Sequence, residues 1–149
     1  MEPMRVRPHH LLDIISSFGA GHKFQPHPYQ HAVHTCAEIV LNDLDTPLQF
    51  VVGADFICAP CIHLGPDGRC DDLVSSLDPP VSKQEYNDAL DRKLLQFFGL
   101  REGQRMTFGE YLQVIREHFA GLPELCAHPR EAPEDRRQRL DAGLRKLGV

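Results

Sequence analysis

Residues 57–70 constrain the fold of this chain more than any other stretch. Three of the five cysteines lie here: Cys58 and Cys61 form a C-x-x-C pair, and Cys70 follows. The Gly-Pro-Asp-Gly run at residues 65–68 is typical of tight turns and would swing Cys70 back toward the pair. The segment therefore predicts a turn-rich knuckle loop. Three thiols in one loop are the start of a zinc or iron–sulfur site whose fourth ligand comes from elsewhere.

Apolar residues at helical spacing predict a mainly α fold around this loop. Capping boxes at Ser82 and Thr107 mark two helix starts, and Gly99 marks a helix end. The expected elements are helices over 9–18, 28–42, from Ser82 to Gly99, from Thr107 to about Phe119 and from Pro133 onward, with a strand at 48–52. We therefore expect about five helices, one short strand or hairpin, and the cysteine knuckle.

Composition narrows the class of protein. A length of 149 residues suits one domain with a real hydrophobic core, so we expect a single metal-binding domain over residues 1–149. The net charge of −5 argues against nucleic-acid binding, which depends on Lys and Arg neutralising phosphates. No signal peptide and no apolar run of about 20 residues is visible, so we expect a cytoplasmic protein without a membrane span. Clustered thiols in that compartment more often bind metal or do redox chemistry than form disulfides.

Cys126 is the first candidate for the fourth ligand. It lies in a proline-bounded loop, residues 123–129, after a predicted helix, and could reach across a small fold. The alternative is a buried thiol, since free cysteine packs like a small hydrophobe. Cys36 falls on the apolar side of a predicted helix, and we interpret it as core.

A second constellation lies at the start of the first predicted helix. Asp13 follows His9 by four residues and His10 by three, and either spacing lets a carboxylate meet an imidazole. Asp13 could orient a ligand histidine or bind a metal itself. The alternative is a pair of exposed histidines in a first helical turn.

A third constellation consists of His27, His31, His34 and Glu38, which would share one face of the second predicted helix. Two histidines one turn apart can share a metal ion. A solvated helix face is the competing interpretation. Elsewhere, His63 and His128 each follow a cysteine by two residues, so either could replace a missing thiolate on zinc.

Two motifs resemble a known family. The run Arg-Pro-His-His-Leu-Leu at residues 7–12 and the run Ile-Cys-Ala-Pro-Cys at residues 57–61, with a later cysteine, resemble domain-of-unknown-function family 1284. These are small bacterial and archaeal proteins described as candidate iron–sulfur proteins. The resemblance implies a cysteine-bound cluster whose ligands are Cys58, Cys61, Cys70 and Cys126.

The chain departs from the family pattern at two positions. Asp13 stands where the family commonly has a cysteine, and Pro129 stands where the family often has a second late cysteine. In one interpretation four thiolates hold one cluster with Asp13 beside it. In the other, Asp13 has replaced a thiolate as a ligand and leaves the site exchangeable.

We therefore expect an iron–sulfur protein, with one [4Fe–4S] cluster favoured. Electron transfer, cluster handling, sensing and a cluster-dependent reaction all remain open, with a redox or cluster-accepting protein as the expected partner. The first alternative is a structural zinc module on the same cysteines with His63 or His128. The second is a thiol redox enzyme using Cys58 and Cys61, although the βαβ context of such motifs is missing.

Overall fold

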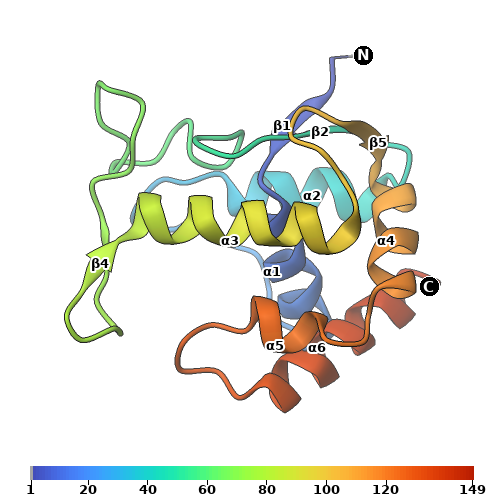
Figure 1. The fold of residues 1–149 in the computed structure, drawn as a ribbon. Coiled ribbons are helices and arrows are strands. Elements are labelled where there is room, and N and C mark those ends of the chain that lie inside the picture. The colour runs from blue at the N-terminus through green and yellow to red at the C-terminus, as the bar shows by residue number, and fades with distance from the viewer. Residues whose placement is uncertain (1) are drawn as a thin grey trace.

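Six helices and five short strands make up residues 2–149, the part of the chain described by the computed structural model (Figure 1). The helices are α1 (Pro8–Gly19), α2 (Val33–Asn42), α3 (Lys83–Phe98), α4 (Phe108–Glu117), α5 (Leu122–Cys126) and α6 (Pro133–Lys146). The strands are β1 (Met4–Val6), β2 (Pro47–Phe50), β3 (Leu73–Val74), β4 (Val81–Ser82) and β5 (Arg105–Thr107). The fold is mainly α, as predicted.

Two small sheets accompany the helices. In the larger sheet β2 is central, parallel to β1 and antiparallel to β5. In the smaller sheet β3 and β4 form an antiparallel pair. The expected strand at 48–52 corresponds to β2. The sequence patterns missed β1 and β5 because strands of three residues are too short to show an alternating pattern.

The helix starts follow the capping chemistry. The Thr107 capping box is complete in α4, and the Ser82 side chain accepts the Glu85 backbone N–H at the start of α3. Gly99 ends α3 in the left-handed conformation, with a φ of 69°. The predicted start of the second helix near Pro28 is wrong, since α2 begins at Val33. Gln30 in the preceding turn has a φ of 64°, which no helix continues through.

The expectation that Cys126 lies in a loop is also wrong. Cys126 is the last residue of α5, a one-turn helix that begins just after Gly121. Pro123 sits near the start of this helix, where a missing N–H costs no hydrogen bond. The Gly-Leu-Pro run therefore starts a short helix as well as ending the previous one.

The core forms where α1 packs on α6. A Cβ on Gly19 would lie 1.9 Å from the Arg139 carbonyl oxygen, and a Cβ on Gly143 would lie 2.1 Å from the Ile15 carbonyl oxygen. These glycines let the two helices approach to backbone contact. Apolar residues from α1, α2, α3, α4 and α6 and from the sheet surround this crossing. In residues 2–149, no helix is long and apolar enough to span a bilayer.

The cysteine segment runs outside this core. It connects β2 to β3 without regular secondary structure and lies beside the N-terminal half of α3, on the green side of Figure 1. The start of α1 lies behind α3 in that view. The site therefore forms between a loop and the ends of two helices.

Candidate metal centre

The cysteine knuckle is held by its own backbone hydrogen bonds. The N–H of Cys61 donates to the carbonyl of Cys58 at 2.9 Å, so the C-x-x-C pair forms a tight turn. Leu64 and Cys70 form an isolated antiparallel bridge across the Gly-Pro-Asp-Gly turn. Gly68 in that turn has a φ of 77°, a conformation that favours glycine. The turn thus folds Cys70 back opposite Leu64, as predicted for a turn at this place.

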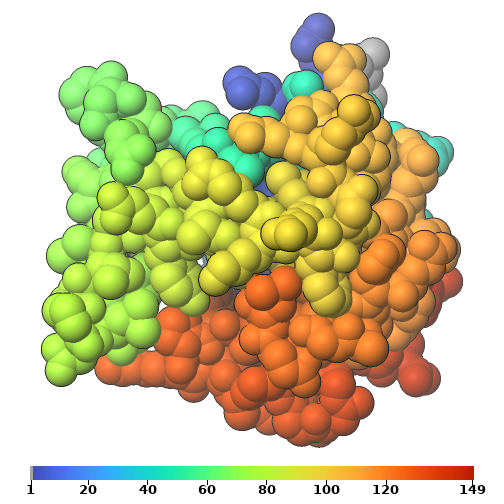
Figure 2. Space-filling view, viewed as in Figure 1, coloured from blue at the N-terminus to red at the C-terminus, as the bar shows by residue number. Residues whose placement is uncertain are grey.

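A cavity of about 470 Å³ opens in front of this knuckle. Cys58, Cys61 and Cys70 line it together with residues from α1, α3 and the segment after α5. On the surface, the yellow side chains of α3 meet the orange C-terminal segment along a hollowed seam (Figure 2). The volume falls within the range of about 300–1,000 Å³ typical of ligand sites.

Five histidines and one carboxylate predicted from the sequence also line the cavity. They are His9, His10, His31, His63, His128 and Asp13. The second constellation, His9, His10 and Asp13, therefore faces the same space as the cysteine knuckle, although the two lie about 50 residues apart in the chain. Asp13, at a position where the resemblance implies cysteine, faces that space too.

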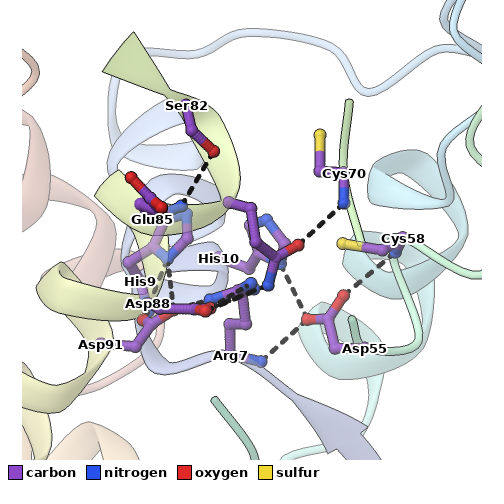
Figure 3. Close-up of polar contacts among 11 residues, drawn as sticks. Arg7, His9, His10, Asp55, Cys58, Cys70, Ser82, Glu85, Asp88 and Asp91 are labelled. Atoms are coloured by element: carbon purple, nitrogen blue, oxygen red, sulfur yellow. Dashed lines mark hydrogen bonds and ion pairs between the residues drawn. The ribbon is translucent and has the colours of Figure 1, made fainter. Parts of the chain in front are cut away.

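Asp55 joins the knuckle to α1. Its Oδ2 accepts the Arg7 backbone N–H and faces Nδ1 of His10, each at 2.8 Å. Its Oδ1 accepts the N–H groups of Ile57 and Cys58, each at 3.0 Å. Figure 3 shows Asp55 between His10 and Cys58. One buried carboxylate thus fixes both a histidine ring and the first cysteine of the C-x-x-C pair.

The electrostatics of this pair follow from burial and charge. Burial acts to raise the pKa of Asp55, but the His10 ring and the backbone N–H donors hold it well below its usual range. Burial acts to lower the pKa of His10, but the Asp55 charge raises it. Asp55 is therefore ionised across the physiological range and a permanent anchor for the ring.

Arg7 is the junction of a second network. Its guanidinium donates to Asp91 at 2.9 Å and to Asp88 at 2.8 Å. Asp91 also accepts the His9 backbone N–H and lies 2.9 Å from His9 Nδ1. The side chain of Asp91 is fully buried, and burial acts to raise its pKa, but His9 and Arg7 hold it below the usual range.

This network reaches Cys70 through Gln84. The amide oxygen of Gln84 accepts the Cys70 backbone N–H at 2.8 Å, and its amide nitrogen donates to Asp88 at 3.1 Å. Because Asp88 pairs with Arg7, hydrogen bonds run without a break from Cys70 through α3 to α1 (Figure 3). The two ends of the cysteine knuckle are thus tied to the same arginine.

Burial sets the protonation of the thiols. It raises the pKa of Cys58 to about 12, and the nearby Asp55 charge acts in the same direction. It also raises the pKa values of Cys36 and Cys126 to about 12. Cys58 without a metal is therefore a neutral thiol, and only a bound cation would convert it to a thiolate at neutral pH.

Cys126 lies in a different environment from the knuckle. It is 4% exposed and belongs to the hydrophobic core. The charged groups around its thiol are Arg136, Asp13 and Glu131. Asp13 accepts from Arg136 at 3.0 Å and lies 3.5 Å from His128 Nε2, so its carboxylate is an ion-pair partner. Cys36 is fully buried in α2, as the sequence predicted.

The third constellation does not form a single helical face. His27 and His31 precede α2, where their rings stack at 4.3 Å, while His34 and Glu38 lie within the helix. His31 faces the cavity. Among residues 2–149, the Nδ1 atoms of His31 and His34 are buried without a hydrogen-bond partner.

The sequence patterns missed the residues that hold the site in place. Asp55, Gln84, Asp88 and Asp91 were not singled out, and Arg7 was noted only within a motif. The sequence of α3 did contain an indication of these residues. Polar residues occupy positions 84, 88 and 91 on the helix face that continues as buried Leu95 and Phe98. Buried polar residues on a core row indicate a functional or organising role.

Together, fold and site define a mainly helical protein with a cysteine- and histidine-lined cavity. Within residues 2–149, the ligand atoms of His10, Asp55 and Cys58 all lie within 4.8 Å of one another, as in a metal-binding group. The family model described as "Protein of unknown function (DUF1284)" matches residues 28–129. The chain belongs to this family, as the cysteine motif indicated. No curated protein and no solved structure matches the chain.

Proposed function

We propose that this protein binds an iron–sulfur cluster, with one [4Fe–4S] cluster favoured, through Cys58, Cys61 and Cys70. The observation that carries the proposal is that three cysteines of one knuckle line a single cavity. A C-x-x-C pair with a third close cysteine is a common source of cluster ligands. Cys126 and His10 are the two candidates for the fourth ligand.

The size of the cavity favours a cluster over a structural zinc ion. A structural zinc ion is enclosed by four ligands and needs almost no free space. The cavity measures about 470 Å³, whereas one water molecule takes up about 30 Å³ in the liquid. Such a space suits a polynuclear cluster or a metal with a bound molecule. Zinc stays the second candidate because imidazoles of His10 and His63 line the same space.

The chemistry of Cys58 argues against a thiol redox enzyme. A nucleophilic cysteine needs a lowered pKa, which a positive neighbour or a helix N-terminus supplies. Burial and Asp55 instead raise the pKa of Cys58 to about 12. This environment suits a thiol that becomes anionic only when a metal binds.

A redox or cluster-accepting protein is the partner we propose for this site. Ile62, next to Cys61, is 55% exposed, and Leu73 at the other end of the knuckle is 52% exposed. Exposed apolar side chains beside a metal site are suited to a transient protein contact. Electron transfer, cluster delivery and a cluster-dependent reaction all fit this arrangement.

The test is metal and sulfide analysis of protein purified without oxygen from its own host. We expect a brown protein with iron and acid-labile sulfide in equal amounts. Cys58→Ser, Cys61→Ser and Cys70→Ser should each lose most of both, while Cys36→Ser, a buried thiol outside the cavity, should keep them. Stoichiometric zinc without sulfide would replace the cluster proposal with the zinc module. A metal-free protein with an oxidisable Cys58–Cys61 pair would revive the thiol redox alternative.

A further inference from the structure

We propose that His10, through Nε2, is the fourth protein ligand of the centre held by Cys58, Cys61 and Cys70, and that Asp55 positions its ring. This inference rests on the proposed metal-binding function and specifies the ligand set of that site. The result is a three-cysteine, one-histidine centre in which α1 and the cysteine knuckle each supply ligands.

The orientation of the ring is the first support. His10 Nδ1 lies 2.8 Å from an Asp55 oxygen, so the proton of the neutral ring belongs on Nδ1 and the lone pair on Nε2. Metal-binding histidines usually have their other nitrogen held by a carboxylate in this way. The His10 side chain is 15% exposed and lines the cavity. Nε2 is thus the ring nitrogen left for a ligand.

The second support is that Asp55 has no capacity left for a metal. A carboxylate offers about four acceptor sites. Asp55 uses them on His10 and on the backbone N–H groups of Arg7, Ile57 and Cys58. In the group of His10, Asp55 and Cys58, Asp55 therefore holds the other two residues in place. The His10 imidazole and the Cys58 thiol remain as the metal ligands.

The competing ligand, Cys126, is less well placed. Its thiol is packed in the core beside the ion pair of Arg136 and Asp13. The residues that line the cavity include Cys58, Cys61 and Cys70 but not Cys126. His10 lines the cavity and forms a close group with Cys58.

The other cavity histidines are also weaker candidates. His9 Nδ1 also lies against a carboxylate, 2.9 Å from Asp91, so ring orientation alone does not separate it from His10. His63 is held by Asp71, which is 67% exposed, so this pair is open to solvent. In residues 2–149, His10 is the histidine that forms a close ligand group with a cysteine.

The experiment is pulsed electron paramagnetic resonance on the reduced cluster in protein labelled with ¹⁵N-histidine. We expect hyperfine coupling from one directly bound nitrogen in the wild-type protein. His10→Cys should keep iron and sulfide, lose this coupling and lower the reduction potential, because a thiolate replaces a neutral ligand. Cys126→Ser and His63→Gln should keep the coupling and the iron content.

The outcomes separate the two proposals. A cluster without nitrogen coupling, together with loss of iron in Cys126→Ser, would overturn the histidine ligand while leaving the cluster function intact. Coupling that persists in His10→Cys would also overturn it, because another histidine would then be the ligand. A protein without any metal overturns both. If the protein binds zinc instead, X-ray absorption should count three sulfur ligands and one nitrogen ligand, and His10→Ala should leave only the three sulfurs. That result would support the ligand set although the cluster proposal fails.

The positioning role of Asp55 has its own readout. Asp55→Asn should weaken iron retention by about tenfold or more and shift the nitrogen coupling, as expected when the carboxylate behind a ligand histidine is lost. Asp71→Asn removes the matched carboxylate behind His63 and should change neither. An unchanged coupling in Asp55→Asn would show that the carboxylate does not orient the ring.

Discussion

At the scale of single residues, the buried charge network should dominate the energetics of the site. Asp91 is fully buried and interacts with both Arg7 and His9. Asp91→Asn keeps the shape but removes the charge that compensates Arg7. We expect a loss of about 3 kcal/mol in the free energy of unfolding, because breaking a buried pair leaves an uncompensated charge. Urea denaturation of the protein measures it.

The control is an aspartate that also has two basic partners but lies nearer the surface. Asp141 pairs with Arg116 and Arg145, and its side chain is 32% exposed. Asp141→Asn should cost less than about 1 kcal/mol, since solvent screens such pairs. Equal losses in the two variants would show that the burial of Asp91 adds nothing.

At the scale of elements, the crossing of α1 and α6 should be the least tolerant contact of the fold. A Cβ on Gly143 would lie 2.1 Å from the Ile15 carbonyl oxygen. Gly143→Ala should therefore destabilise the protein by about 3 kcal/mol, because overpacking outweighs the gain in helix propensity of about 1 kcal/mol. Thermal denaturation should show a lower midpoint for this variant.

Gly109 in α4 offers the same substitution in a looser place. Its added Cβ would come no closer than 3.2 Å, to the Leu44 carbonyl oxygen. Gly109→Ala should stay within about 1 kcal/mol of the wild type, where the propensity gain offsets a small adjustment. A Gly143→Ala protein as stable as Gly109→Ala would mean that the helices can separate at no cost.

The loop between α5 and α6 should respond to acid through Glu131. Burial acts to raise the pKa of Glu131, but Arg136 and the His128 backbone N–H hold it below its usual value. A carboxylate with a lowered pKa in the folded state stabilises above its unfolded pKa of about 4.3 and loses this contribution as the pH falls further. The stability difference between wild type and Glu131→Gln should therefore be full at pH 7 and shrink below about pH 4.5.

Urea titrations of the two proteins at several pH values measure this difference. Glu134→Gln is a suitable control because Glu134 also pairs with an arginine, Arg137, but at the exposed surface of α6. Its difference from the wild type should be small at every pH. A Glu131 difference that grows on acidification would contradict the direction of the pKa shift.

Most elements could be predicted from the sequence because they rest on local signals. The capping chemistry of Thr107 and the helix start at Pro133 are set within a few residues, and the structure agrees with both. The predicted start of α2 and the predicted loop at Cys126 were wrong, because tertiary packing and short turns determine the backbone at these two places. Local patterns report only what neighbouring residues impose.

The candidate site divides in the same way. The cysteine knuckle was visible because its ligand spacing is local, and the placement of His9 and His10 beside it agrees with the interpretation of the motif. Asp55 could not be recognised as a site residue because its role depends on a contact with His10, 45 residues away in the sequence. Such contacts leave no periodic pattern.

At the scale of the whole molecule, the fold divides into a helical core and a cysteine knuckle, and we expect only the knuckle to depend on metal. The α1–α6 crossing and its apolar core contain no cavity-lining cysteine, whereas the knuckle has no regular helix and depends on Asp55 and Gln84 for its anchors. Removing the metal should therefore loosen the knuckle and leave the core folded. The core is large enough to stand alone, since a chain of this length buries most of its apolar surface.

Hydrogen exchange of metal-loaded and metal-free protein measures this division. We expect faster exchange after metal removal at Cys58, Cys61 and Cys70, whose N–H groups are held by the knuckle network. Amides of α1 and α6 should exchange at the same rate in both states, because their protection reflects core packing. Uniform acceleration across the chain would mean instead that metal binding and global folding are one event. In that case the losses in the free energy of unfolding caused by Asp91→Asn and by Gly143→Ala should both change with metal content, which is a second check.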